Sequence, residues 1–145
     1  ECFYAWKGGG AFLNGQRIHT RSITSLGDSL IATGFPYYDY SRQEGFLRIL
    51  SFFMQNTRGI RRFGSAALDL AYVACGRFDL FFEYSLNAWD VAAGAFLVQE
   101  AGGKVSDFSG KEDYLFGREI FAAADGIYEA GFAVVQKEFG QKVII

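Results

Sequence analysis

The sequence has 145 residues, the length of one compact domain with a substantial hydrophobic core. Apolar residues make up 50% of it and charged residues 21%, a balance that fits a folded globular protein and excludes a disordered one. The formal net charge of −2 gives no reason to expect nucleic-acid binding, and no apolar run approaches the ~20 residues that a membrane span needs.

The first part of the chain, residues 4–19, is expected to form a β-hairpin. Asn14 and Gly15 lie between apolar, extended-looking segments, and both residue types tolerate the positive φ of a tight turn. The glycine-rich hairpin gives way to a different pattern near residues 22–26. We therefore predict a boundary there, with residues 1–24 forming the hairpin and residues 25–145 a second domain.

From residue 25 onward, predicted strands alternate with predicted helices. Strands are expected at 30–33, 59–63, 78–83, 104–106 and 120–124. Helices are expected from a Ser41 cap to about Asn56, at 65–75, from 87 or 88 to 101, and at 127–139. This alternation predicts an α/β domain with a largely parallel or mixed sheet.

The segment Gly64, Ser65 and Ala66 lies where a predicted strand feeds a helix through small residues. Free backbone N–H groups and the positive helix end make such a turn a natural binding site for an anion or a hydroxyl. Small residues also serve close helix–sheet packing, so the segment alone does not decide between the two.

Two acidic residues are candidates for a site. Glu83 ends an apolar strand, and ligands gather at the carboxyl ends of strands in open α/β sheets, although an exposed strand-end charge is the commoner case. Asp90 falls in the first turn of its helix, where the dipole favours the ionised form that Mg²⁺ requires, although capping alone would explain it. We expect the neighbouring Trp89 to pack in the core and Glu100 to be solvated or ion-paired.

The remaining polar residues give weaker indications. Arg58, Arg61 and Arg62 form the one tight basic cluster, which fits a subunit contact, an acidic partner or ordinary ion pairing. The two cysteines form neither a disulfide framework nor a zinc-binding spacing, which favours a reducing, cytoplasmic location. His19 lies away from every candidate segment, and we expect it to be structural or exposed.

Several motifs together resemble the inositol monophosphatase family, in particular its bacterial inositol-1-monophosphatase members. The motifs, in order, are residues 7–15 (KGGGAFLNG), 33–36 (TGFP), 61–71 (RRFGSAALDLA), 89–94 (WDVAAG) and 100–103 (EAGG). The resemblance covers essentially the whole chain. Several long motifs in the right order make it far more specific than a lone glycine pattern.

The resemblance implies a fold, a reaction and a set of residues. The fold would be the C-terminal mixed-sheet domain of the sugar and inositol phosphatases, preceded by a hairpin remnant of the N-terminal α+β domain. The reaction would be Mg²⁺-dependent, lithium-sensitive hydrolysis of a small phosphorylated polyol or sugar, in a homodimer. Asp90 would bind metal and substrate, Glu83 would bind substrate hydroxyls, and Gly64, Ser65 and Ala66 would line the same pocket.

The sequence also departs from the family pattern. Members carry a metal-binding glutamate and an Asp-x-x-Asp-Gly-Thr motif upstream of the hairpin, and neither occurs in this sequence. We therefore expect a truncated C-terminal portion whose catalytic residues lie in the missing segment and which is inactive alone. Two alternatives stay open: a related 3′-phosphonucleotide or fructose-bisphosphate phosphatase, and a non-catalytic binding or scaffold remnant.

Overall fold

The computed structural model describes residues 1–139, so residues 140–145 of the expected domain 25–145 lie outside it. The hairpin region forms a three-stranded antiparallel sheet of β1 (Phe3–Trp6), β2 (Gly10–Leu13) and β3 (Gln16–Ile18). Asn14 and Gly15 have φ values of 50° and 85° in the turn between β2 and β3, which confirms the predicted hairpin turn.

The rest of the described chain is an α/β unit with a five-stranded mixed sheet. The strands are β4 (Leu30–Thr33), β5 (Gly59–Arg61), β6 (Leu80–Tyr84), β7 (Lys104–Ser106) and β8 (Glu119–Ala123). The helices are the 3₁₀-helix η1 (Leu26–Asp28), α1 (Gln43–Asn56), α2 (Ala66–Ala74), α3 (Ala88–Glu100) and α4 (Asp125–Phe139). The predicted fold class is therefore confirmed, and most predicted bounds agree with the observed ones within two residues.

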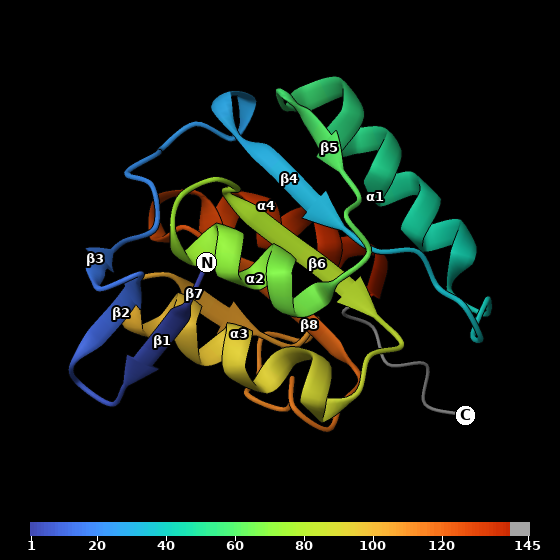
Figure 1. Cartoon of the computed structure of the whole chain (residues 1–145). Helices are drawn as coiled ribbons and strands as arrows, with labels where there is room; N and C mark the ends of the chain where they lie inside the picture. The colour runs from blue at the N-terminus through green and yellow to red at the C-terminus, as the bar shows by residue number, and fades with distance from the viewer. Residues whose placement is uncertain (140–145) are drawn as a thin grey trace.

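The order of strands in the large sheet is β5-β4-β6-β8-β7 (Figure 1). Strands β4, β5 and β6 run parallel to one another, whereas β8 is antiparallel to β6 and to β7. The carboxyl ends of the three parallel strands consequently meet at one edge of the sheet.

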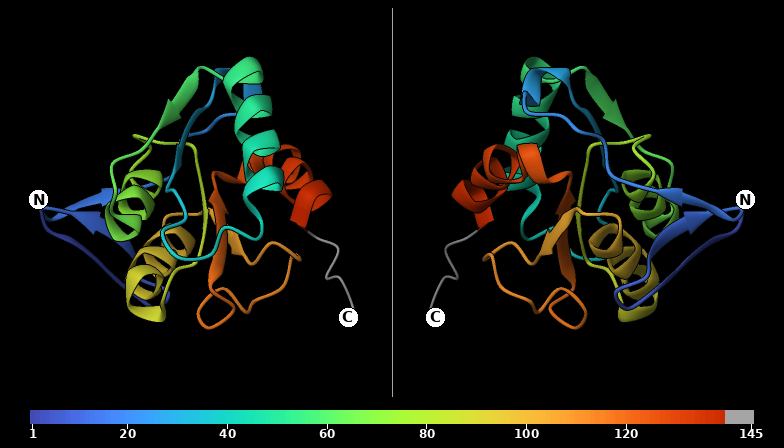
Figure 2. Two further views of the ribbon diagram at one scale, coloured as in Figure 1. Left: turned by 90° about the vertical axis from the view of Figure 1, so that its right-hand side faces the viewer. Right: turned by 90° about the vertical axis from the view of Figure 1, so that its left-hand side faces the viewer.

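Helices cover both faces of this sheet, with α2 and α3 on one face and α1 and α4 on the other (Figures 1 and 2). The central strand β6 is buried along its whole length, as expected for a strand covered on both faces. Phe81 packs in the α2–α3 core, whereas its neighbours Leu80 and Phe82 pack in the α1–α4 core. Because side chains alternate along a strand, Glu83 falls on the α2–α3 face.

The three-stranded sheet packs against α3 and shares its core, to which Phe3, Ala5 and Ala11 contribute. Glu100, at the end of α3, accepts hydrogen bonds from the backbone N–H groups of Gly8 (2.9 Å) and Gly10 (3.0 Å). Glu100 was expected to be solvated or ion-paired; its carboxylate is partly exposed and, in addition, caps the hairpin backbone. The division of the chain at residue 24 stays a prediction.

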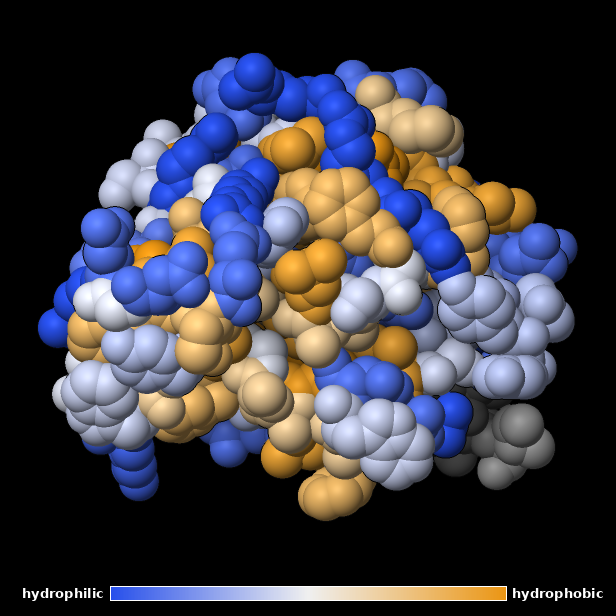
Figure 3. Space-filling model, viewed as in Figure 1, coloured by the Kyte–Doolittle hydropathy of each residue, from blue (hydrophilic) through white to orange (hydrophobic). Residues whose placement is uncertain are grey.

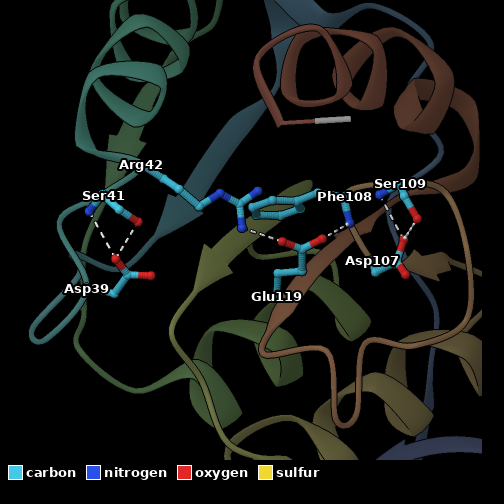
Figure 4. Close-up of polar contacts among 7 residues, drawn as sticks. All are labelled: Asp39, Ser41, Arg42, Asp107, Phe108, Ser109 and Glu119. Atoms are coloured by element: carbon cyan, nitrogen blue, oxygen red, sulfur yellow. Dashed lines mark hydrogen bonds and ion pairs between the residues drawn. The ribbon is translucent and has the colours of Figure 1, made fainter. Parts of the chain in front are cut away.

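The start of α1 also differs from the prediction. Ser41 does not cap the helix, because its hydroxyl donates a hydrogen bond to Asp39 Oδ1 (2.6 Å) and the N-cap residue is Arg42 (Figure 4). The Arg42 guanidinium pairs with Glu119 and lies 4.1 Å from the ring centroid of Phe139. Glu119 in turn accepts the backbone N–H of Phe108 (3.1 Å). This contact ties the beginning of α1 to β8 and to the end of α4.

No helix within residues 1–139 combines the length and the apolar character needed to cross a membrane. Cys2 and Cys75 are both free thiols. His19 is exposed and lies in the connection after β3, as expected.

Candidate functional site

A pocket of about 350 Å³ lies at the carboxyl ends of β4, β5 and β6. Its walls come from the three segments that follow these strands. This is the edge of the sheet at which open α/β folds bind their ligands. All five residues singled out from the sequence line it, namely Gly64, Ser65, Ala66, Glu83 and Asp90.

Glu83 lies at the end of β6 with only 8% of its surface exposed. The carboxyl group packs directly against Gly34, where an added Cβ would lie 2.0 Å from Oε1. Burial raises the pKa of Glu83 to about 7, and the nearby Asp69 and Asp90 add to the increase while Arg62 opposes it. Near neutral pH the group therefore exists in both protonation states and offers both a donor and an acceptor for hydroxyl groups.

Asp90 lies in the first turn of α3 and performs the capping role that the sequence left open. Its Oδ2 accepts the backbone N–H of Asn87 at 2.9 Å. The same residue lines the pocket, so capping and pocket lining are combined in one side chain. Within residues 1–139, no hydrogen bond involves Oδ1, which leaves this oxygen for a ligand.

The segment from Gly64 to Ala66 forms the turn into α2. Gly64 has a φ of +87°, a conformation that favours glycine, and Ser65 is the N-cap residue of the helix. The Ser65 hydroxyl oxygen accepts the backbone N–H of Leu68 at a long 3.4 Å. Backbone N–H groups of the first helical turn consequently stand beside the pocket.

Asp69 is a site-adjacent residue that the sequence reasoning missed. It lies one turn into α2, is 1% exposed, and neither carboxyl oxygen has a hydrogen-bond partner within residues 1–139. Burial raises its pKa to about 6, against the opposing charge of Arg62. Its position on the buried stripe of α2, between Ala66 and Val73, is the signal that could have revealed it.

The rim of the pocket is aromatic. Trp89 is 79% exposed and lines the pocket, so the expectation that it packs in the core is wrong. The other aromatic residues at the rim include Phe35, Tyr37 and Tyr38, which belong to the segment between β4 and α1. This segment ends at Arg42, whose pairing with Glu119 fixes its far end (Figure 4).

The described residues offer a partial donor set for a metal ion. Within residues 1–139, there is no group of three His, Cys, Asp or Glu residues that could hold one. Mg²⁺, however, often binds through one or two protein carboxylates and completes its shell with water and substrate oxygens. The Asp90 carboxylate at the pocket wall fits that requirement, but this part of the chain does not supply a complete protein site.

The chain is similar to known proteins of one family. The protein-family model described as "Inositol monophosphatase family" matches residues 1–140 of this chain. Over 138 residues the chain is 45% identical to "Nus factor SuhB" of Pseudomonas aeruginosa, covering 94% of this chain and 51% of that protein. It is 43% identical over 137 residues to "Inositol-1-monophosphatase" of Mesorhizobium japonicum, covering 94% and 52%.

A solved structure shares the fold. The extragenic suppressor protein suhB from Bartonella henselae superimposes with a TM-score of 0.88 at 42% identity, covering 93% of this chain and 52% of that one. The chain thus spans about half the length of the relatives that it matches.

Proposed function

Because the chain belongs to the inositol monophosphatase family, we propose that the protein carrying it, at the length of its relatives, hydrolyses phosphate monoesters of small polyols with Mg²⁺. An inositol monophosphate is the proposed substrate. The observation that carries this proposal is the meeting of Glu83, Asp90 and the turn from Gly64 to Ala66 in one pocket.

Five residues of the pocket have a proposed role. Asp90 would hold the metal and contact the substrate through the oxygen that does not cap α3. Glu83 would bind polyol hydroxyl groups, accepting or donating according to its protonation state. Gly64, Ser65 and Ala66 would face the substrate through backbone N–H groups and the Ser65 hydroxyl.

Bound Mg²⁺ would supply the means to activate water and to neutralise charge on the phosphoryl oxygens. The pocket offers Asp90 as its metal ligand, and the remaining ligands are proposed to come from the additional length present in the relatives. For this reason the isolated 145-residue chain is proposed to bind Mg²⁺ weakly and to be inactive.

The experiment compares the longer protein with its Asp90→Asn variant. Asparagine keeps a side-chain oxygen for the Asn87 cap but removes the charge that a metal requires. Phosphate release from inositol monophosphate should require Mg²⁺ in the parent and fall at least about 100-fold in the variant, because metal-supported charge stabilisation is lost. Lithium inhibition is measured in the same assay. Equal activity in both proteins would reject the proposed role of Asp90.

The alternatives within the phosphatase class concern the substrate. A 3′-phosphonucleotide phosphatase or a fructose-bisphosphate phosphatase would use the same pocket. A panel of inositol, nucleotide and sugar phosphates tested on the longer protein separates them by the ratio of kcat/KM values.

A Nus-factor role is a second candidate function, because one of the relatives described above bears the name "Nus factor SuhB". It would be a binding role, independent of hydrolysis. The expectation that the protein has no nucleic-acid partner stays a prediction. The test is whether the longer protein and its Asp90→Asn variant replace the relative in a strain that lacks it. Replacement by both proteins would separate this role from catalysis.

Homodimer formation and cytoplasmic location also remain proposals. Exposed apolar side chains on α1, including Leu47 (52%) and Met54 (64%), support a subunit contact. Figure 3 shows an orange, apolar area at its upper right, where α1 runs in the same view of Figure 1. Sedimentation of the longer protein and of its Met54→Glu variant tests this contact, since a dimer through α1 should dissociate in the variant.

A further inference from the structure

The outer face of the three-stranded sheet carries a group of aromatic rings. Along β1, Phe3 and Ala5 pack on the core shared with α3. Because side chains alternate along a strand, Tyr4 and Trp6 lie on the opposite face, and Phe12 of β2 pairs directly with Tyr4 there. The ring centroids of Tyr4 and Phe12 are 5.3 Å apart and those of Phe12 and Trp6 4.9 Å, with interplanar angles of 9° and 4°. The three rings therefore form one nearly parallel group, the aromatic face.

The aromatic face is exposed. Trp6 is 53% and Tyr4 38% accessible. The Trp6 indole rests on Gly9 in the turn between β1 and β2, where an added Cβ would lie 1.8 Å from Nε1. An antiparallel sheet with one solvated face commonly carries polar residues on that face, so three neighbouring rings on it indicate a binding surface.

Two cations lie beside the rings. Arg17 of β3 pairs with Phe12 and so shares the outer face, and its guanidinium lies over Gly10, where an added Cβ would be 2.7 Å from Nη2. Gly10 is the pairing partner of Trp6. Lys7 follows Trp6 in the turn and is exposed. Among residues 1–139, neither Lys7 nor Arg17 forms an ion pair.

Glu100 is a carboxylate whose charge acts on both cations, and it is engaged elsewhere. Hydrogen bonds from the backbone N–H groups of Gly8 and Gly10 lower its pKa, with a smaller contribution from the charges of Arg17 and Lys7. The carboxylate thus binds the hairpin backbone, and the donors of the two cations are left for an external anion.

Single-stranded nucleic acid combines the two chemistries that this face offers, because its bases stack on exposed rings and its phosphates pair with neighbouring cations. A duplex fits less well, since its base faces are hidden within the stack. The formal net charge of −2 belongs to the whole chain, whereas attraction of a ligand to one face depends on the charges gathered there.

We propose that the aromatic face binds single-stranded nucleic acid, with bases stacked on Tyr4 and Trp6 and phosphates at Lys7 and Arg17. The sheet lies at the left of Figure 1, whereas the arrowheads of β4 and β6, which mark the pocket edge, point to the right. The surface is therefore separate from the pocket and stands independently of the proposed functions. It departs from the expectation, based on net charge, that the protein has no nucleic-acid partner.

The test uses Trp6 as its own reporter. A Trp89→Phe background leaves Trp6 as the remaining tryptophan. The 145-residue chain and the longer protein are titrated with oligo(U) and oligo(dT) of about eight nucleotides, which distinguish RNA from DNA as the ligand. Trp6 fluorescence should be quenched with a Kd of about 10 to 100 μM, and log Kd should rise with log salt with a slope of about 1.4 for two phosphate contacts. A duplex of the same length should bind at least about tenfold more weakly.

Variants separate stacking from charge. Tyr4→Leu should weaken binding about tenfold because a stacked base loses its ring, whereas Tyr4→Phe keeps the ring and should bind as the parent does. Arg17→Gln should reduce the salt slope by about 0.7. The matched controls are Tyr38→Leu, at a tyrosine on the pocket rim, and Arg58→Gln, at an exposed arginine outside the sheet. Both should leave affinity and salt slope unchanged.

Four results would overturn the proposal. The first is no quenching by either oligonucleotide, and the second is equal binding of the duplex, which excludes stacking. In the third, Tyr38→Leu abolishes binding while Tyr4→Leu does not, so that the ligand occupies the pocket. In the fourth, the 145-residue chain binds but the longer protein does not, which means that the additional length covers this face. Phosphate release plays no part in these measurements, so failure of the phosphatase proposal is scored separately.

Discussion

The carboxyl group of Glu83 fills the space in front of Gly34, so that a methyl group at Gly34 would lie 2.0 Å from Oε1 and 2.1 Å from the carboxyl carbon. The end of β6 and the segment after β4 are thus in van der Waals contact at the floor of the pocket. An alanine at position 34 would therefore have to displace the Glu83 carboxyl group, whereas backbone conformation does not call for glycine there, since the φ of Gly34 does not fall in the left-handed region.

The first prediction follows from this contact. Gly34→Ala should displace the Glu83 side chain and destabilise the fold by about 1 kcal/mol, the low end of the cost of overpacking a buried site, because the displaced atoms are the end of a flexible side chain. Chemical denaturation measures the change in the free energy of unfolding. Gly27→Ala is the control, because the nearest atom to an added Cβ there lies 3.5 Å away. Equal stability of the two variants would contradict the contact.

The second prediction concerns Asp69, whose pKa burial raises from 3.8 to about 6. Below the unfolded value the carboxyl is protonated in both states and burial costs little. As the pH rises through about 6, the folded chain must ionise a buried carboxyl or keep a proton that the unfolded chain has lost, so stability falls. The shift of about two units corresponds to a loss of at most about 3 kcal/mol.

Asp69→Asn removes this titration and should flatten the corresponding part of the stability curve. The free energy of unfolding of the variant minus that of the parent should therefore increase between about pH 4 and pH 7. Any pH-independent difference in stability between the two proteins does not affect this increase. Urea denaturation at several pH values within this range gives the difference curve. Glu112→Gln, an exposed carboxylate, provides the control. A difference curve for Asp69→Asn that is independent of pH would show that Asp69 does not carry the penalty.

The third prediction concerns Arg42, which pairs with Glu119 and lies against the rings of Tyr84, Phe108 and Phe139. Arg42→Lys keeps the charge but loses the planar group that stacks on these rings. We expect a loss of about 1 to 2 kcal/mol in the free energy of unfolding. Arg48→Lys, which changes a more exposed pair with Glu138, should cost less than about 0.5 kcal/mol. Comparable losses in both variants would argue against the stacking.

The fourth prediction concerns Glu100 and the hairpin. Hydrogen bonds from the backbone N–H groups of Gly8 and Gly10 lower the pKa of the Glu100 carboxyl. Glu100→Gln should weaken these contacts, because charge-assisted hydrogen bonds are stronger than neutral ones. Amide hydrogen exchange at Gly8 and Gly10 should accelerate in the variant while exchange in β6 is unchanged. Unaltered exchange at both glycines would mean that Glu100 does not hold the hairpin.

Much of the fold could be predicted from local pattern. The alternation of apolar strands and helices, the turn at Asn14 and Gly15, and the glycines that end helices give nearly all the elements. The order of strands could not be predicted in this way, because it depends on pairings between distant residues such as Ile31 with Leu80. The prediction that Ser41 caps α1 was wrong because the Ser41 hydroxyl donates its hydrogen bond to Asp39, two residues earlier.

The candidate site was only partly accessible to sequence reasoning. The end of a predicted strand pointed to Glu83, and the motif at residues 89–94 pointed to Asp90. Trp89 was misplaced because an aromatic residue beside a helix start is typical of a core position. Trp89 lies two residues before the buried Val91, about 200° around the helix, and so faces away from the core. Asp69 was hidden within an apolar run, and the contact of Glu100 with Gly8 spans 92 positions.

The assembly of the pocket from the ends of β4, β5 and β6 has a consequence for how the protein folds. No short stretch of chain contains the walls of the pocket, so none of it exists until the parallel strands have paired across long sequence separations. A nascent chain released before β6 has joined β4 presents no half-made site to a ligand. Ligand binding therefore stabilises only the native state, and a bound ligand indicates that these strands have paired.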